Sequence, residues 1–343
     1  MPASEFDLIA AITERLPAAG ERVRVPSGDD AAVVEANGPS AVSVDAIVDG
    51  VHFTLERFGA PAVGRKALSA GLSDLAAMGA MPGEAYVVVG APAELPDDQL
   101  LGIAEGLADV ASREKVSVAG GDLVASPVLV VSVTAIGYQP EGGRLVRRAG
   151  ANPGDLIAVT GELGGAAVGL ELLSDGAKAN VPAELRDALV ARQLDPTPRI
   201  GAGLALAGAG ATAMIDISDG LGADAGHLAS SSACRLEIDL DRVPIADGVS
   251  QVAGGDRAAL ELAASGGEDY ELLVALPPDA GPRARDAVSA TGVSLTEIGY
   301  ATDGQGVALR LPGGERIEPR GFDQRRGSLS GSGSGSGSGS DSG

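Results

Sequence analysis

The chain has 343 residues, and 47 acidic against 25 basic side chains give it a formal net charge of −22. One cysteine and two histidines exclude a disulfide framework and any Cys-rich or His-rich metal centre. The acidic balance excludes non-specific binding to a nucleic-acid backbone, which needs a basic surface. A hydrophobic content of 45% is enough for a buried core, and the length predicts two domains rather than one.

Almost all the basic side chains are arginines, because Lys66, Lys115 and Lys178 are the only lysines. We interpret this composition as a halophile adaptation to high internal salt rather than as that of an ordinary acidic enzyme. No segment has the roughly 20 apolar residues of a membrane span. Since residues 1–7 are acidic where a signal peptide is basic, we expect a cytoplasmic protein.

Helix-like and strand-like segments alternate along the first half of the chain. The first helix is stopped by Pro17, and the second has proline at its start and glycine at its end. The strands are recognised by alternation or by runs of β-branched residues. We expect helices at residues 4–16, 61–80 and 97–113, and strands at 41–48, 86–89 and 127–136.

A turn-rich, basic segment at residues 147–155 marks a domain boundary. After it the alternation resumes, which predicts an α/β (α+β) fold in both halves. The domains are then residues 1–146 and 147–327, followed by a disordered Ser/Gly tail at 328–343. In the second half we expect strands at 156–160, 213–217, 236–240 and 270–275, and helices at 166–173, 183–192, 200–207, 222–231 and 279–290.

The aspartates are the most informative residues, because many stand beside Gly or Ser at the ends of apolar runs. Asp74 even lies within an apolar helix, where a charge is costly unless it is paired. Mg²⁺ prefers oxygen ligands and commonly bridges carboxylates to substrate phosphates. Each aspartate alone is better explained as a turn or helix-cap residue, and only the set as a whole points to a metal site. The set comprises Asp29, Asp30, Asp45, Asp74, Asp122, Asp216 and Asp219, with Glu268, Asp269 and Glu271 in a further acidic motif.

The common nucleotide-binding and nucleophile motifs are absent from the sequence, including a Gly-rich loop that ends in Lys-Ser or Lys-Thr. Bound ATP would therefore need another cradle, with the backbone N–H groups of Gly120 and Gly121 as candidates. Arg148 is either a phosphate clamp or a solvated loop cation. His52 is more often structural than functional in such a position, and Phe322 is either a core residue or a stacking face for a ring.

Taken together, these motifs resemble the thiamine-monophosphate kinase family, in the superfamily that includes aminoimidazole ribonucleotide synthetase. The resemblance covers about residues 3–325. It is carried by Gly28-Asp29-Asp30-Ala31-Ala32-Val33, Ser43-Val44-Asp45, Gly50-Val51-His52-Phe53, Lys66-Ala67-Leu68, Leu72-Ser73-Asp74-Leu75-Ala76-Ala77-Met78-Gly79-Ala80, Gly120-Gly121-Asp122, Ile215-Asp216-Ile217-Ser218-Asp219-Gly220-Leu221 and Ser265-Gly266-Gly267-Glu268-Asp269-Tyr270-Glu271-Leu272.

The resemblance implies a two-domain, synthetase-like fold with a mixed N-terminal sheet. The N-terminal domain would bind ATP and Mg²⁺, and its sheet and helices would form the interface of a homodimer. The implied reaction is direct in-line transfer of the γ-phosphoryl group of ATP to thiamine phosphate with several Mg²⁺ ions. Because the acceptor is already a phosphate anion, no catalytic general base is expected.

Site residues follow from the resemblance residue by residue. The ATP contacts would be Gly121, Arg148 and Ser218, and the thiamine phosphate contacts His52, Glu268 and Phe322. Val44 stands where the family usually has threonine, so only its backbone carbonyl could serve a metal. The implied metal ligands are Asp30, Ser43, Val44, Asp45, Asp74, Asp122, Asp216 and Asp219.

Three alternatives remain open on the sequence alone. One is a sister ATP-using enzyme of the same superfamily, although the cysteines and lysine that mark some relatives are absent. Another is a non-catalytic Mg²⁺ or nucleotide sensor. The third is a metal-dependent phosphatase, in which water replaces the acceptor phosphate.

Overall fold

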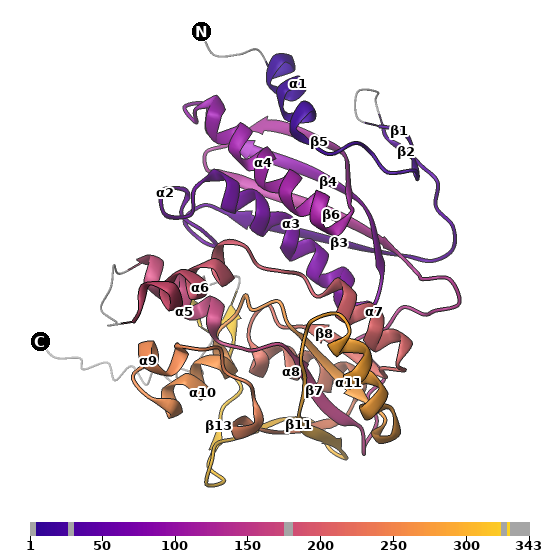
Figure 1. Ribbon diagram of the computed structural model, residues 1–343, viewed down its shortest axis with the longest axis vertical. Coiled ribbons are helices and arrows are strands. Elements are labelled where there is room, and N and C mark those ends of the chain that lie inside the picture. Colours follow the sequence, from indigo (N-terminus) through magenta and orange to yellow (C-terminus); the bar gives the residue numbers. More distant parts are fainter. Residues whose placement is uncertain (1–4, 27–30, 175–180, 324–327, 330–343) are drawn as a thin grey trace, which may run out of the picture.

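The computed structural model describes residues 5–26, 31–174, 181–323 and 328–329. These residues form two domains stacked along the long axis of the molecule (Figure 1). Each domain is built around one larger β-sheet with helices packed on it. The predicted α/β (α+β) class with a mixed N-terminal sheet is therefore confirmed.

The N-terminal domain contains a four-stranded sheet with two long helices on one face (Figure 1). The strands pair antiparallel except for the last two in the sheet order, which are parallel. In that order they are β3 (Ser40–Val48), β6 (Val130–Tyr138), β4 (Met81–Ala91) and β5 (Ser117–Ala125). The two helices are α3 (Ala60–Ala77) and α4 (Asp97–Glu114), and the smaller elements are α1 (Glu5–Arg15), α2 (Leu55–Phe58), β1 (Val23–Val25) and β2 (Val33–Val34).

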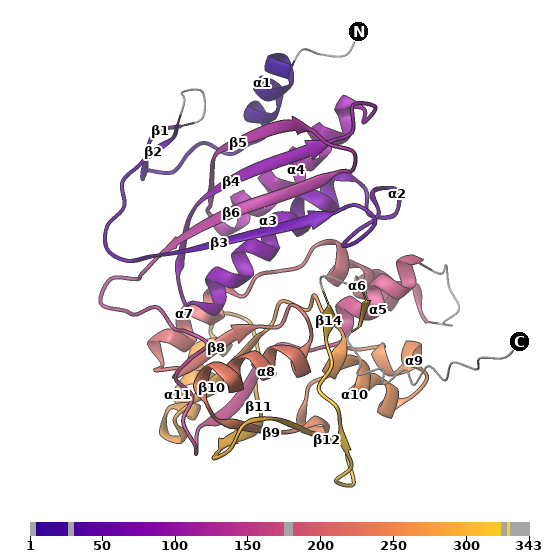
Figure 2. The ribbon, with the colours of Figure 1, turned by 180° about the vertical axis from the view of Figure 1, so that it is seen from behind.

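No helix of the described residues covers the opposite face of this sheet (Figure 2). Side chains alternate between the two faces along a strand. On β3, Ala41 and Ile47 are buried against the helices, whereas Val42 and Val44 are 60% and 67% exposed on the other side. We call this uncovered side the outer face.

The described residues of the C-terminal domain form a seven-stranded sheet in which β9 and β12 pair parallel and the other neighbouring strands antiparallel. Helix α8 lies on one side of this sheet, and α7 and α11 on the other (Figures 1 and 2). In order the strands are β13 (Arg316–Ile317), β12 (Gly306–Arg310), β9 (Arg235–Asp239), β11 (Leu295–Thr302), β7 (Leu156–Thr160), β10 (Leu272–Leu276) and β8 (Ala213–Asp216). The helices are α5 (Gly165–Ser174), α6 (Ala183–Leu194), α7 (Ile200–Gly208), α8 (Leu221–Ser232), α9 (Val249–Ala253), α10 (Asp256–Ser265) and α11 (Gly281–Ser289), with 3₁₀ turns at Leu240–Arg242 and Pro278–Ala280.

Helix α3 joins the two domains. Its buried side chains belong to one core that also includes residues of α7 and β10 in the C-terminal domain. The crossing with α7 is close, since a Cβ on Gly203 would lie 2.1 Å from the carbonyl oxygen of Ala76. Gly79, with φ of +61°, ends the helix in the left-handed region that favours glycine. The domains are thus held in one arrangement by a fully packed helix.

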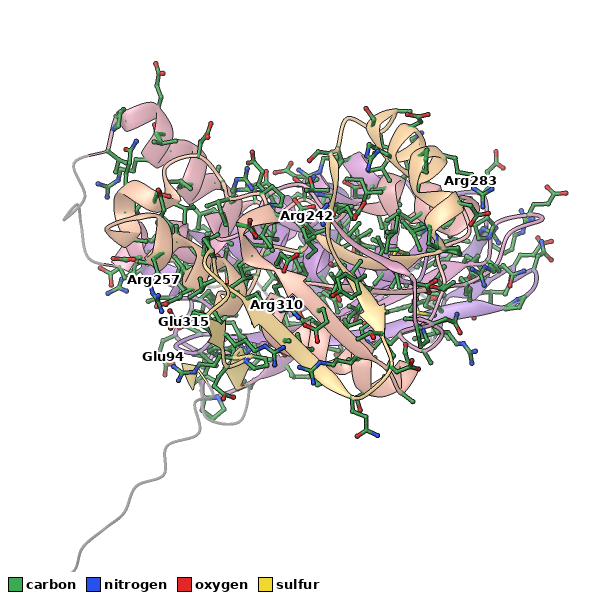
Figure 3. The ribbon with its side chains drawn as sticks, turned by 90° about the horizontal axis from the view of Figure 1, so that it is seen from below. Glu94, Arg242, Arg257, Arg283, Arg310 and Glu315 are labelled. Carbon is green, nitrogen blue, oxygen red and sulfur yellow. The ribbon has the colours of Figure 1, made fainter. Side chains whose placement is uncertain are left out.

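Acidic side chains at the surface of the C-terminal domain are partly neutralised by arginines. Arg257 and Glu315, which Figure 3 shows on neighbouring elements, form a two-pronged ion pair at 2.7 and 2.9 Å. Arg242 pairs with Glu297 at 3.3 Å. Both partners of the Arg257–Glu315 pair are more than half exposed, so it contributes little to stability.

Most predicted helices and strands lie within a few residues of the observed ones. Among the longer elements, the prediction missed strands β5, β11 and β12 and helix α10. Gly120 and Gly121, the candidate backbone donors to ATP, lie within β5. The short strand β14 (Phe322–Asp323) pairs with β15 (Ser328–Leu329), the first two residues of the expected tail. Among the described helices, none combines the length and apolar character needed to cross a bilayer.

Candidate active site

A cavity of about 610 Å³ lies between the two domains. Its walls come from β3 and the turn after it, from the loop between β8 and α8, from the loop before β10, and from β14. Seven predicted site residues line it, drawn from segments more than 250 residues apart in the chain. They are Asp45, His52, Asp216, Ser218, Asp219, Glu268 and Phe322.

One side of the site is a cluster of carboxylates at the domain boundary. Ser43 Oγ lies 2.9 Å from Asp45 Oδ2 and also contacts Asp74 Oδ2, so both carboxylates reach one hydroxyl group. Burial and the negative charge of Asp74 raise the pKa of Asp45 above its ordinary value. Helix α3 therefore carries Asp74 to the inner face of β3, where it contacts a hydroxyl group and lies beside another carboxylate.

Asp216 joins this cluster from the C-terminal domain. It ends β8, is only 3% exposed, and accepts a hydrogen bond of 2.7 Å from Ser73 Oγ on α3. Burial raises its pKa to about 7; the charges of Asp74 and Asp45 add to the shift, and Arg148 opposes it. Asp45, Asp74 and Asp216 are thus close enough to repel one another, and Arg148 is close enough to act on Asp216.

The loop between β8 and α8 is held by Asp224, a residue that was not among the predicted site residues. Asp224 is 3% exposed, and its Oδ2 accepts the backbone N–H groups of Ser218, Asp219 and Gly220, each at 3.0 Å. Its position in the first turn of α8 was the available signal, because carboxylates are favoured there. Ligand atoms of Asp219, Asp224 and His227 also lie within 4.8 Å of one another.

The opposite side of the cavity is aromatic and apolar. The rings of His52 and Phe322 are inclined at 57° with their centroids 6.5 Å apart. His52 Nδ1 accepts the backbone N–H of Val48 at 3.1 Å, which fixes the orientation of the imidazole. Leu170 and Val51, which are 39% and 49% exposed, line the same side. This side can receive a flat ring.

The loop before β10 is strained and closely packed. Glu268 and Tyr270 have φ of +69° and +50°, which is uncommon for side chains with a Cβ and is typical of functional loops. The backbone N–H of Glu268 donates to Ser218 O at 2.8 Å. A Cβ on Gly267 would lie 2.4 Å from that same oxygen, so this contact requires glycine. The two loops that face the cavity therefore support each other.

Three predicted residues lie elsewhere in the single chain. Asp122 is exposed on β5, and its register through Val88 and Ser132 places it on the outer face, opposite the cluster. The Val44 side chain points to the same outer face. Gly121 lines a separate apolar cavity of about 140 Å³ beneath α1. Asp30 lies outside the described residues.

The donor set fits a hard cation. Three carboxylates and a serine hydroxyl at one end of a cavity offer only oxygen ligands, which is the preference of Mg²⁺. Burial is the main cause of the raised pKa values of Asp45 and Asp216, and the repulsion from neighbouring carboxylates that adds to it would be relieved by a bound cation. The cavity thus combines a potential metal-binding end with an end that can accept a ring.

Comparison with known proteins agrees with this geometry. Residues 28–139 match the family AIR synthase related protein, N-terminal domain, and residues 152–312 match AIR synthase related protein, C-terminal domain. Thiamine-monophosphate kinase of Caulobacter vibrioides is 37% identical over 91% of this chain and 88% of the relative. The chain belongs to the thiamine-monophosphate kinase family.

Other members of the family are similarly close. Thiamine-monophosphate kinase of Mycobacterium tuberculosis is 42% identical over 72% of this chain and 73% of the relative. The crystal structure of thiamine-monophosphate kinase from Stenotrophomonas maltophilia K279a has a TM-score of 0.80 at 36% identity, covering 90% of this chain and 97% of that chain. AaThiL complexed with AMPPCP and TMP has a TM-score of 0.74 at 33% identity, covering 92% and 96%.

Proposed function

We propose that this protein transfers the γ-phosphoryl group of ATP to thiamine phosphate, forming thiamine diphosphate and ADP. The observation that carries the proposal is the interdomain cavity, which joins a carboxylate cluster to an aromatic side. Family membership supports it, and AaThiL, a structural relative, has been solved with AMPPCP, an ATP analogue, and TMP, thiamine monophosphate. Since ATP is available in the cytoplasm, we place the reaction there.

Asp45, Asp74 and Asp216, with Ser43, would hold Mg²⁺ at the phosphate end of the cavity. Bound there, the cation would neutralise phosphate charge that these carboxylates would otherwise repel. Asp219 is a further candidate ligand from the loop that Asp224 fixes. Arg148, whose charge already acts on Asp216, would contribute positive charge on the same side. The carboxylates therefore set where the triphosphate can lie.

The acceptor would lie at the aromatic side. Phe322 offers a ring face, His52 is held by its bond to the Val48 backbone, and Glu268 offers a carboxylate to the polar edge of a ring. An oxygen of the acceptor phosphate forms the new bond to the γ-phosphorus while the bond to the β–γ bridging oxygen breaks. The acceptor needs no deprotonation by the protein, so catalysis rests on alignment and charge.

We further propose that the protein is a homodimer formed through the outer face of the N-terminal sheet. Val42, Val44 and Val88 are 60%, 67% and 42% exposed on this face, and apolar side chains gathered on one face are typical of protein interfaces. Asp122 lies on the same face, so a second chain packed there would place it in the interface. Any role of Gly121 and Asp122 toward ATP would then depend on the dimer.

The proposal is tested by incubating the full chain with ATP, Mg²⁺ and thiamine phosphate and separating the products chromatographically. We expect thiamine diphosphate to form, and to disappear when any one component is omitted or when EDTA is added. Phosphate release that does not depend on thiamine phosphate would contradict the proposal and favour a phosphatase. Binding of ATP and Mg²⁺ without turnover would instead favour a nucleotide sensor.

A further inference from the structure

Lys66 is a charged residue at a fully buried position, where an apolar residue would avoid the free-energy cost of burying a charge. It lies on α3, is 0% exposed, and faces the C-terminal domain. Its ammonium nitrogen is 2.6 Å from Glu268 Oε1 and 5.2 Å from the centre of the Phe58 ring. In the part of the chain that the structure describes, the ammonium has no well-directed hydrogen bond. Its charge is therefore balanced mainly by Glu268.

The other carboxylate oxygen of Glu268 is held by a residue of the C-terminal domain. Gln193, on α6 and 1% exposed, donates from Nε2 to Glu268 Oε2 at 2.6 Å. One carboxylate oxygen is thus held by the N-terminal domain and the other by the C-terminal domain. The Glu268 side chain keeps 24% of its surface exposed and lines the interdomain cavity.

The backbone at Glu268 is consistent with a side chain that must be placed accurately. Its φ of +69° is unfavourable for a residue with a Cβ, and such conformations persist only where the surroundings over-determine them. A buried ion pair is seldom retained for stability alone, because an apolar pair of similar volume is often at least as stable. A lysine that fixes a functional carboxylate explains both observations.

We propose that Lys66 and Gln193 are positioning residues that hold the Glu268 carboxylate in one orientation against the acceptor side of the cavity. This inference rests on the proposed function, and it adds two residues to the recognition of the acceptor. The carboxylate so placed suits an acceptor ring that carries an amino group and a nearby positive charge, as thiamine phosphate does. ATP, bound at the carboxylate cluster, would not depend on it.

The test compares Lys66→Met and Gln193→Leu with the unaltered chain, because both replacements keep approximate side-chain volume. We expect the KM for thiamine phosphate to rise by up to ~100-fold, the effect of misplacing a binding group by about 1 Å, while the KM for ATP stays within about twofold. Calorimetric titration with thiamine phosphate in the presence of a non-hydrolysable ATP analogue should show the same loss of affinity. The affinity for thiamine phosphate is thereby measured even if the protein catalyses no reaction.

A double-mutant cycle with Glu268→Gln shows whether Lys66 acts through Glu268. We expect Lys66→Met to have little further effect on acceptor affinity once Glu268 has been replaced. Tyr138→Phe is the control for stability, since it removes a buried 2.7 Å hydrogen bond to Glu84 in the same domain, away from the cavity. It should lower the melting temperature but leave both KM values unchanged.

Equal increases in both KM values, additive effects in the cycle, or wild-type acceptor affinity in both variants would overturn the inference. If Lys66→Met does not fold, Gln193→Leu alone decides, because it removes a neutral hydrogen bond and leaves the ion pair intact. If the affinity for thiamine phosphate depends on Lys66 and Gln193 but no thiamine diphosphate forms, the proposed function is refuted while this inference is supported.

Discussion

The carboxylate cluster leads to a prediction in which activity and stability change in opposite directions. Asp45→Asn removes one negative charge while keeping the shape of the side chain. Asp45 and Asp74 both contact the Ser43 hydroxyl, one of them at 2.9 Å, so their nearest oxygens are at most about 6 Å apart. At an effective dielectric constant of about 20, two unit charges at that separation repel by ~3 kcal/mol.

Part of this repulsion is recovered when Asp45 becomes neutral, and some hydrogen bonding to Ser43 is lost. In EDTA we therefore expect the variant to be more stable than the unaltered chain by ~1–2 kcal/mol, which corresponds to a rise in melting temperature of ~1–3 °C for a chain of this length. Turnover should fall by at least ~100-fold, since a metal-holding carboxylate contributes several kcal/mol to charge neutralisation. Mg²⁺ should raise the melting temperature of the unaltered chain much more than that of the variant.

The measurements are thermal unfolding with and without Mg²⁺ and the rate of thiamine diphosphate formation. Asp303→Asn is the matched control, because it makes the same charge change at an exposed turn between β11 and β12. It should leave all three quantities close to those of the unaltered chain. A less stable Asp45→Asn protein in EDTA, or one with near-normal turnover, would refute the reasoning.

Two further predictions concern the assembly and the pH dependence of stability. Val44→Lys should convert the proposed dimer to a monomer in light-scattering measurements. Tyr300→Lys, at a site 45% exposed on the other domain, should leave the dimer intact. A dimer that survives Val44→Lys would exclude the outer face as the interface. Burial raises the pKa of Asp269 from 3.8 to about 7, although Gly164 and Ala166 donate backbone hydrogen bonds to it. The folded chain then keeps a proton that the unfolded chain has released, so this residue makes the free energy of unfolding decrease as pH rises from about 4 to about 7. Asp269→Asn should show a smaller decrease in urea unfolding between those pH values, and an equal decrease in both proteins would contradict this assignment.

Much of the site could be predicted because the relevant signals are local. Asp74 stood out as a charge within an apolar helix, and the structure pairs it with Ser43 on the adjacent strand. Asp216 was recognisable at the end of an apolar strand, where β8 ends. Both signals depend only on the contrast between a carboxylate and its immediate neighbours.

What could not be predicted depends on contacts between distant segments. Two adjacent glycines disfavour a strand, yet Gly120 and Gly121 lie in β5 because parallel pairing with β4 supports the backbone there. Lys66 has no local signal for a role, since its partner Glu268 is about 200 residues away in the chain. The face of the sheet that carries Asp122 follows from strand register, which no local pattern in a Gly-Gly-Asp segment reveals.

The central claim is that the cavity transfers a phosphoryl group between two bound substrates. It is tested most directly by supplying ATP labelled in its γ-phosphate, with Mg²⁺ and thiamine phosphate, and following the label through one round of product formation. We predict that the label appears in thiamine diphosphate, one equivalent for each ADP formed, and not in free phosphate. Label that appears in inorganic phosphate at the same rate with or without thiamine phosphate would contradict the account.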